Sequence, residues 1–303
     1  KIDTVTTETI GTNIASTITG LAVGDDSAQD SCTKSGSTWY CRVLITNSNS
    51  DANMRTIPTL DGYVQKSHPL PTGNARSTNT IAQRTPTVDD VLYAYKITGI
   101  STETIAADIT TSVSPLTVGD ASGQDTCTRS GSTWYCPVQT ANSNAGSIIA
   151  TPTLDGYVQK SYNIVTQTTR TANTANQVTS ALQNVQYAYK ITSVTAEGPG
   201  TGLTSSLTSL VIGDGSGQDA CTLSSGDWYC SVRIAYSDQT PLFARPIKDG
   251  YVLANYNIGA QTTRSANTAT QVATTVSDVR FAFTVTSVTT EGPGTALTSS
   301  ITT

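Results

Sequence analysis

The six cysteines carry the clearest chemical signal in the chain, because they form three pairs with eight residues between partners. The pairs are Cys32 with Cys41, Cys127 with Cys136, and Cys221 with Cys230. Zinc sites use shorter spacings and more ligands. Partners at this spacing face each other across a two-residue turn, such as a type II′ turn at Gly131-Ser132, which brings Cα atoms to about 4.5 Å. We therefore predict three hairpin disulfides and an oxidising, extracellular environment.

His68 is the only histidine and the only conventional candidate for acid–base catalysis. Its counterparts in the repeats described below are Tyr162 and Tyr256, so the position accepts an aromatic ring without an imidazole. No Gly-x-Ser-x-Gly motif accompanies it, so a Ser-His-Asp site is not expected. We predict no catalytic residue, no cofactor and no enzymatic activity.

A Gly-Asp loop with two or three carboxylates precedes each cysteine pair, with its first aspartate at Asp25, Asp120 and Asp214. Calcium binding is one interpretation, although calcium takes about six to eight oxygen ligands. A turn is the interpretation we favour, because Gly-Asp and Ser are typical turn residues; no metal site is predicted. The Asp-Gly pairs at 61, 155 and 249 predict type I′ turns.

The chain is built from three copies of one sequence unit. Trp-Tyr-Cys begins at 39, 134 and 228, and Asp-Gly-Tyr-Val begins at 61, 155 and 249, where the period is 94 residues. Apolar and polar residues alternate over 39–45 and over 185–191, which predicts half-buried strands. Residues 178–185 show helical spacing and predict at most a short helix. The length of the unit is typical of a β-sandwich domain.

We therefore predict an all-β fold of three tandem β-sandwich domains with an additional terminal β-strand. The predicted boundaries are 1–19 for an N-terminal strand segment, 20–101, 102–195 and 196–289 for the three repeats, and 290–303 for a C-terminal strand. The residues predicted in the core are Trp39, Trp134, Trp228, Tyr93, Tyr187 and Phe281.

One segment occurs four times although there are only three repeats. The segment is recognised by a pair of apolar residues four positions apart: Ile14 and Ile18, Ile109 and Val113, Leu203 and Leu207, and Leu297 and Ile301. If each sandwich uses one copy, one is left over at either end of the chain. An apolar strand without a partner is an aggregation liability. Three alternatives follow: a longer chain, a strand doubled within an end domain, or addition of the strand to a domain of another subunit.

The strand at 185–194 and the Glu-Gly-Pro-Gly turn at 197–200 resemble strands F and G of fibronectin type III and related immunoglobulin-like modules. The resemblance implies immunoglobulin-like sandwiches. Tandem Ser/Thr-rich modules of this kind also resemble subunits of microbial surface filaments, pilus-like fibres and adhesin stalks. This resemblance rests on composition and repeats and implies no functional residues.

Composition and repetition together direct the functional prediction. Charged residues make up only 13% of the chain and the net charge is −5, which argues against a nucleic-acid partner. No apolar run is long enough to cross a membrane. We predict a structural subunit of an extracellular filament, a homopolymer joined head-to-tail by strand addition, with O-linked glycans on threonine. The alternative is an adhesin stalk or an array of carbohydrate-binding modules, with Tyr40, Tyr135 and Tyr229 as sugar-stacking surfaces.

Overall fold

A computed structural model describes residues 1–49, 53–70, 83–144, 146–166, 174–258, 264 and 267–301. The described helical turns are 3₁₀ turns of three residues, and the regular structure is otherwise β-strand, so the all-β prediction is confirmed. No helix in this described part of the chain is long and apolar enough to span a membrane. The chain divides into two compact units, unit 1 with residues 1–154 and 159–185, and unit 2 with residues 155–158 and 186–303.

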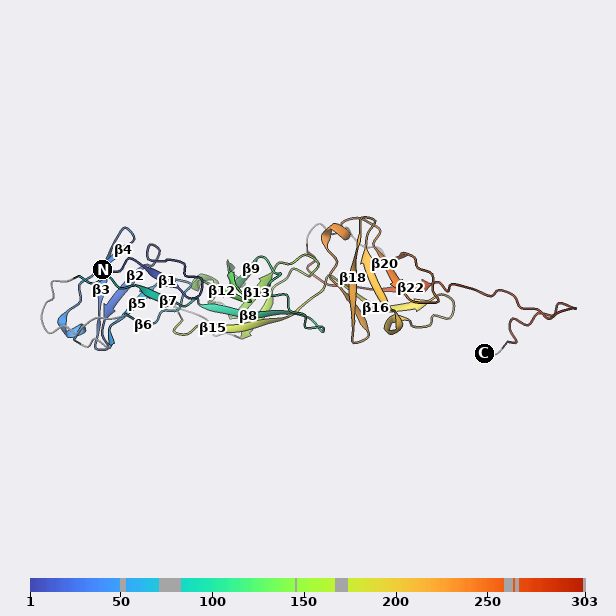
Figure 1. Ribbon diagram of the computed structural model, residues 1–303, viewed down its shortest axis with the longest axis horizontal. Helices are drawn as coiled ribbons and strands as arrows, with labels where there is room; N and C mark the ends of the chain where they lie inside the picture. Colours follow the sequence, from blue (N-terminus) through green and yellow to red (C-terminus); the bar gives the residue numbers. More distant parts are fainter. Residues whose placement is uncertain are drawn as a thin grey trace. The chain divides into compact units, whose positions relative to one another are not determined.

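Unit 1 begins with the first repeat, whose strands lie at the blue end of the chain in Figure 1. A five-stranded sheet has the order β4-β3-β2-β5-β6, and a two-stranded sheet pairs β1 with β7 in parallel. An isolated bridge between Ile2 and Trp39 joins the beginning of the chain to β4. The strands are β1 (Val5–Thr7), β2 (Gly20–Gly24), β3 (Gln29–Ser35), β4 (Thr38–Cys41), β5 (Arg55–Thr59), β6 (His68–Pro69) and β7 (Val88–Val91).

The second repeat completes unit 1 with two four-stranded sheets, β10-β9-β13-β14 and β11-β12-β8-β15. Strands β8 and β15 pair in parallel, as β1 and β7 do. The strands are β8 (Tyr95–Thr102), β9 (Leu116–Asp120), β10 (Gly123–Thr126), β11 (Thr128–Ser130), β12 (Thr133–Cys136), β13 (Ser147–Pro152), β14 (Tyr162–Thr166) and β15 (Val178–Val185).

Unit 2 repeats this arrangement with one continuous strand in place of β10 and β11. Its sheet has the order β21-β20-β17-β18-β19-β16-β22, and β16 pairs with β22 in parallel. The strands are β16 (Tyr189–Ala196), β17 (Ser209–Gly213), β18 (Gln218–Ser224), β19 (Asp227–Cys230), β20 (Phe243–Ile247), β21 (Tyr256–Asn257) and β22 (Val272–Val279). Side chains from both halves of this sheet, including Leu210, Trp228 and Val276, form one core cluster.

A tryptophan fixes the opening segment of each repeat. Trp39, Trp134 and Trp228 are buried, and each indole N–H donates a hydrogen bond to a backbone carbonyl of that segment. The acceptors are Ala15 O at 2.9 Å, Thr110 O at 3.1 Å and Thr204 O at 2.8 Å. An indole needs such a partner when it is buried, so the tryptophan both fills the core and selects the path of the segment.

The boundaries between repeats differ from those predicted at 101/102 and 195/196. Strand β8 pairs with β12 and β15 of the second repeat, and β16 pairs with β19 and β22 of the third. The segment 185–194 is therefore the end of one strand and the beginning of another, separated at residues 186–188. Alternation alone could not show this division, because apolar residues keep the same period across it.

Two local predictions are wrong. Residues 178–185 form strand β15, in which register shifts place Leu182 and Val185 both in the core although they are three positions apart. Among the Asp-Gly turns, only the glycines have positive φ, +95° at Gly62 and +94° at Gly156. Positive φ at the second central residue alone defines a type II turn, not type I′.

The three predicted disulfides are confirmed, with Cα–Cα distances of 4.2, 4.2 and 4.3 Å. In the first repeat Cys32 and Cys41 lie opposite each other, and the turn residue Gly36 has a φ of +62°. Gly131 has a φ of +58° in the second repeat, as a type II′ turn requires at its first position.

Replacing both Cys127 and Cys136 by alanine should lower the free energy of unfolding by about 2.5–3 kcal/mol, because the crosslink closes a loop of about ten residues. Urea unfolding would measure the change. Thr128→Ala in the same hairpin is the control, because this exposed side chain should contribute less than about 0.5 kcal/mol. Equal stability of the double variant and the control would contradict the prediction.

Candidate interaction site

Three copies of the opening segment lie inside the described repeats. Ile2, Ile97 and Ile191 occupy equivalent positions and are at most 2% exposed. The paired apolar residues that follow are also buried: Ile14 and Ile18, Ile109 and Val113, Leu203 and Leu207. The N-terminal copy is thus part of the first repeat and is not the left-over strand.

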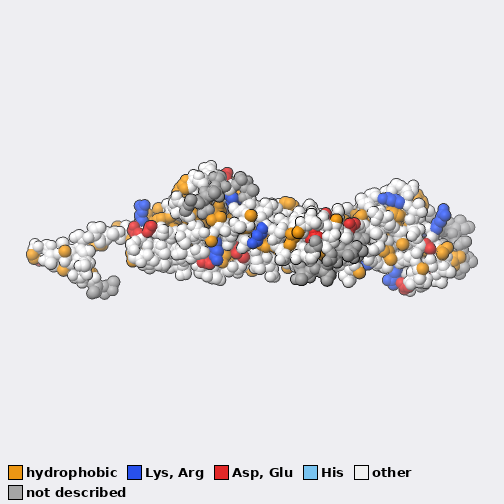
Figure 2. Space-filling model, turned by 180° about the vertical axis from the view of Figure 1, so that it is seen from behind, with side chains coloured by type: hydrophobic (Ala, Val, Ile, Leu, Met, Phe, Trp, Pro, Cys, Tyr) orange, Lys and Arg blue, Asp and Glu red, His pale blue; other side chains and the backbone are white. Residues whose placement is uncertain are grey.

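The fourth copy, residues 283–301, is the left-over one and is named here the C-terminal segment. Phe283 is 90% exposed and Val285 is 70% exposed, whereas Tyr95 and Ile97 at the equivalent positions of the second repeat are 2% and 0% exposed. Ile301 is 57% exposed. Figure 1 shows no strand beside this segment, and Figure 2 shows hydrophobic side chains along its surface.

From Val288 to Ile301 the C-terminal segment repeats the backbone hydrogen bonds of the buried copies. Leu297 N–H donates to Val288 O at 2.7 Å, which repeats the 2.7 Å bond from Ile14 to Val5 in the first repeat. The Thr298 hydroxyl accepts from Val288 N–H at 2.9 Å, and Thr204 does the same for Val194 in the third repeat at 2.8 Å. The segment therefore already has the backbone shape that a sandwich accepts.

The opening segments of the first and third repeats also carry a glutamate that binds the end of the same repeat. Glu8 Oε1 accepts a hydrogen bond from Tyr93 N–H at 3.0 Å, and Glu197 Oε1 accepts from Phe281 N–H at 3.0 Å. Gln177 donates to the same Glu8 oxygen. Glu291 is the equivalent residue of the C-terminal segment, and it is exposed.

Aromatic rings fill the junctions between repeats. In unit 1, Tyr93 lies between Tyr63 and Tyr135, with ring centroids 5.1 and 5.6 Å away. Burial raises the pKa of Tyr63 to about 12. In unit 2, the corresponding rings are Tyr157, Tyr187 and Tyr229, with distances of 5.1 and 5.7 Å. Rings at these distances and tilted orientations attract one another beyond the area that they bury.

The Asp-Gly turn forms the second part of each junction. Asp61 Oδ1 accepts hydrogen bonds from the N–H and the hydroxyl of Thr140, at 2.9 and 2.8 Å. A Cβ on Gly62 would lie 2.7 Å from Pro137 O, so the two backbones meet closely. In unit 2, Asp155 Oδ1 accepts from Ile234 N–H at 2.9 Å, and a Cβ on Gly156 would lie 2.7 Å from Ser231 O.

These junctions overturn the interpretation of three sugar-stacking tyrosines. Tyr135 and Tyr229 are 5% and 4% exposed, because Tyr93 and Tyr187 cover them. Tyr40 alone is open, at 46% exposed. Three equivalent tyrosine platforms therefore do not exist, and sequence reasoning could not detect the covering ring, which comes from the preceding repeat.

The acidic loops are held by hydrogen bonds within each repeat. Asp25 Oδ1 accepts from the N–H and hydroxyl of Ser27, and Asp30 Oδ2 accepts from Leu44 N–H at 2.8 Å. For Asp214, burial alone would raise the pKa, but hydrogen bonds from Ser216 and Gln239 hold it below its ordinary value. The carboxylates thus act as turn and loop supports, as the favoured interpretation proposed.

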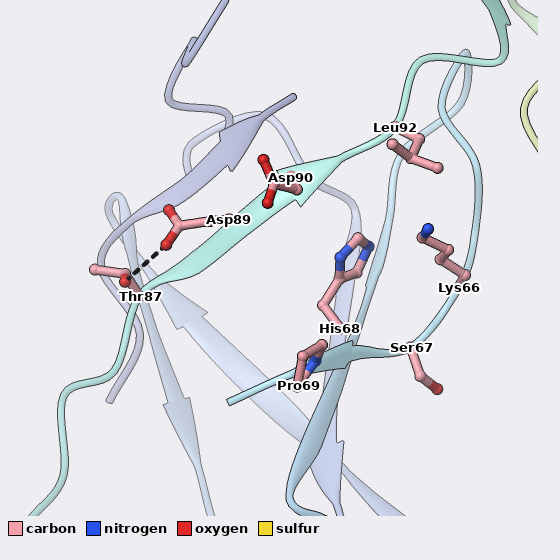
Figure 3. Close-up of a pocket in the computed structure, with 8 residues that line it drawn as sticks. All are labelled: Lys66, Ser67, His68, Pro69, Thr87, Asp89, Asp90 and Leu92. Atoms are coloured by element: carbon pink, nitrogen blue, oxygen red, sulfur yellow. Dashed lines mark hydrogen bonds between the residues drawn. The ribbon is translucent and has the colours of Figure 1, made fainter. Parts of the chain in front are cut away.

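His68 lines a cavity of about 280 Å³ in the first repeat, together with Lys66, Asp89, Asp90 and Leu92 (Figure 3). The side chain is 4% exposed, and its Nε2 has no hydrogen-bond partner among the described residues. Tyr256 at the equivalent position of the third repeat accepts a hydrogen bond from Arg280 N–H at 3.0 Å. The cavity is therefore the space that a tyrosine fills elsewhere.

No protein-family model matches the chain, and no curated protein matches it by sequence. The solved structure titled "The Bacillus anthracis TIE protein" is 11% identical in sequence, with a TM-score of 0.24. The alignment covers 91% of this chain and 49% of that one, so this chain spans about half the length of that structure. A likeness at this TM-score says nothing about fold or function.

His68→Tyr should stabilise the first repeat by about 1 kcal/mol through cavity filling. It should also remove the dependence of the free energy of unfolding on pH that His68 causes. Burial and the nearby Lys66 lower the pKa of His68, although Asp90 and Asp89 oppose the shift. The unfolded chain therefore binds more protons below about pH 6.5, and stability falls as the pH falls. Urea unfolding at pH 8 and pH 5 would measure both effects.

Tyr162→His in the second repeat is the matched control, since it should create the same cavity and introduce the same acid sensitivity. Parallel loss of stability in the parent chain and in His68→Tyr between pH 8 and pH 5 would contradict the assignment.

Proposed function

We propose that this protein is a non-enzymatic structural subunit of an extracellular filament, in which the C-terminal segment of one copy enters the first repeat of the next. The observation that supports the proposal is the exposure of Phe283, Val285 and Ile301, in a segment whose residues 288–301 repeat the backbone hydrogen bonds of the buried copies. The three disulfides fit an oxidising environment outside the cell.

The C-terminal segment matches residues 2–18 position by position. Val285 corresponds to Ile2, Val288 to Val5, Glu291 to Glu8, Leu297 to Ile14 and Ile301 to Ile18. The incoming segment would pair in parallel with β7, and the Trp39 indole would donate to it as it now donates to Ala15. This is strand addition to a receiving sheet.

The receiving position is occupied by the copy's own residues 1–19, so assembly requires an exchange of segments. Such an exchange replaces one set of buried apolar contacts by a nearly equal set and costs little at equilibrium, as in domain swapping. New contacts between the two copies must then supply the net free energy of association. An exchange of this kind is directional, because a donor segment enters only a receiving repeat.

Val285→Asp should abolish filament formation and leave the isolated chain equally stable. The side chain is 70% exposed in the chain alone, whereas the receiving core would enclose an unpaired carboxylate at a cost of several kcal/mol. Negative-stain electron microscopy and sedimentation velocity would measure assembly, and thermal unfolding followed by circular dichroism would measure stability.

Thr286→Asp is the matched control, because Thr98 and Thr192 at the equivalent positions stay exposed within their repeats. Ile2→Asp is the reciprocal variant, and it should promote assembly by weakening the resident segment. Filaments of Val285→Asp as abundant as those of the parent chain would rule out strand donation. A loss of thermal stability in Val285→Asp would show that the same chain covers the segment, as in a stalk.

A further inference from the structure

Each junction between repeats joins two different faces, and both faces recur once more with no partner among the described residues. We call the face that carries Tyr135 or Tyr229 the ring-receiving face, and the face that carries Tyr93 or Tyr187 the ring-donating face. In the two junctions these faces meet with nearly equal ring distances, 5.6 and 5.7 Å. The contact is thus a repeated, specific packing arrangement.

The unpartnered ring-receiving face lies on the first repeat. Tyr40 is 46% exposed, against 5% and 4% for its counterparts Tyr135 and Tyr229. Arg42 is exposed at the position where Pro137 and Ser231 meet a glycine of the preceding repeat.

The unpartnered ring-donating face lies on the third repeat. Phe281 is half-buried and packs on Tyr251 at 5.0 Å, so two of the three rings are already in place. Ala282 and Gly250 are exposed, whereas Ala94, Ala188, Gly62 and Gly156 at the same positions are buried. A Cβ on Gly250 would meet nothing within 4 Å.

We propose that these two faces bind each other between copies of the chain, with Phe281 of one copy placed between its own Tyr251 and Tyr40 of a second copy. The inference rests on the proposed function, and it names the contact that drives the exchange of segments. The Asp249 carboxylate would accept a hydrogen bond from Ile45 N–H of the second copy, as Asp61 and Asp155 accept from Thr140 and Ile234.

The partner of each exposed face is a second copy of the chain, because the two internal junctions show the same two kinds of face bound to each other. Ala282 N–H already donates to Gly250 O at 3.0 Å, the bond that Ala94 makes to Gly62 and Ala188 makes to Gly156, each at 3.0 Å. Ring and turn are therefore arranged for the contact before it forms. The C-terminal segment begins directly after this face, so one encounter brings both the rings and the donated strand into position.

Tyr40→Ala should raise the critical concentration for filament formation about tenfold, which corresponds to about 1.4 kcal/mol per contact. Tyr40→Phe should assemble as the parent chain does, because the stack needs the ring and not the hydroxyl. Leu253→Ala is the control for loss of an exposed apolar side chain, since Leu253 is 63% exposed and lies outside both faces. Sedimentation of polymer against protein concentration would give each value.

A double-mutant cycle with Phe281→Ala tests whether the two rings touch. If they do, the double variant should be little worse than either single variant. Additive effects, or an unchanged critical concentration in Tyr40→Ala, would overturn the ring contact. Val285→Asp tests strand donation separately. If Val285→Asp forms no filaments while Tyr40→Ala still forms them at the parent concentration, the proposed function stands and only the ring contact is ruled out.

Discussion

The structure depends on the way each repeat acquires its first strand. That strand pairs in parallel with the last strand of the same repeat, and a buried tryptophan of the disulfide hairpin holds the segment that follows it. In unit 1, strand β8 of the second repeat begins soon after β7 of the first repeat ends, so one short stretch of chain closes one repeat and opens the next. In the unit 2 junction the change from one repeat to the next takes only residues 186–188.

Short connections of this kind leave no room for a separate linker, so the residues between two repeats must make contacts with both. Tyr93 is an example. Its N–H binds Glu8 and its hydroxyl lies 3.1 Å from the Thr7 hydroxyl, while its ring packs on Tyr135 of the following repeat. One residue thus ties the opening segment of the first repeat to the surface of the second, and the close approach at Gly62 permits no side chain between them.

Much of the local structure could be predicted from sequence because it is encoded by short-range spacing. The cysteine pairs predicted the hairpins, alternation predicted strands, and the count of four opening segments against three repeats predicted that one would lack a sandwich. The identity of that segment could not be predicted, since Ile14 and Leu297 occur in equivalent patterns and differ only in what packs on them. The buried rings of Tyr135 and Tyr229 were missed for the same reason. The rings that bury them, Tyr93 and Tyr187, lie about 42 positions earlier in the chain, and a local sequence pattern cannot indicate so distant a contact. The bulged strand at Leu182 and Val185 was misread because the register shift imitates helical spacing.

A contact between the two unpartnered faces is heterologous, because it joins different residues of the first and third repeats. Heterologous contacts continue into open polymers unless the rotation closes a ring. The intermolecular junction would nevertheless lack one contact of the internal ones. Thr284 stands where Lys96 and Lys190 lie 5.3 Å from the rings of Tyr135 and Tyr229. Without this cation–π attraction, the joint between copies would be weaker than the joints within a copy. Under the proposed assembly, a filament under stress would separate into whole subunits before any repeat is pulled from its neighbour, and both the donated segment and the receiving repeat would stay intact for reassembly.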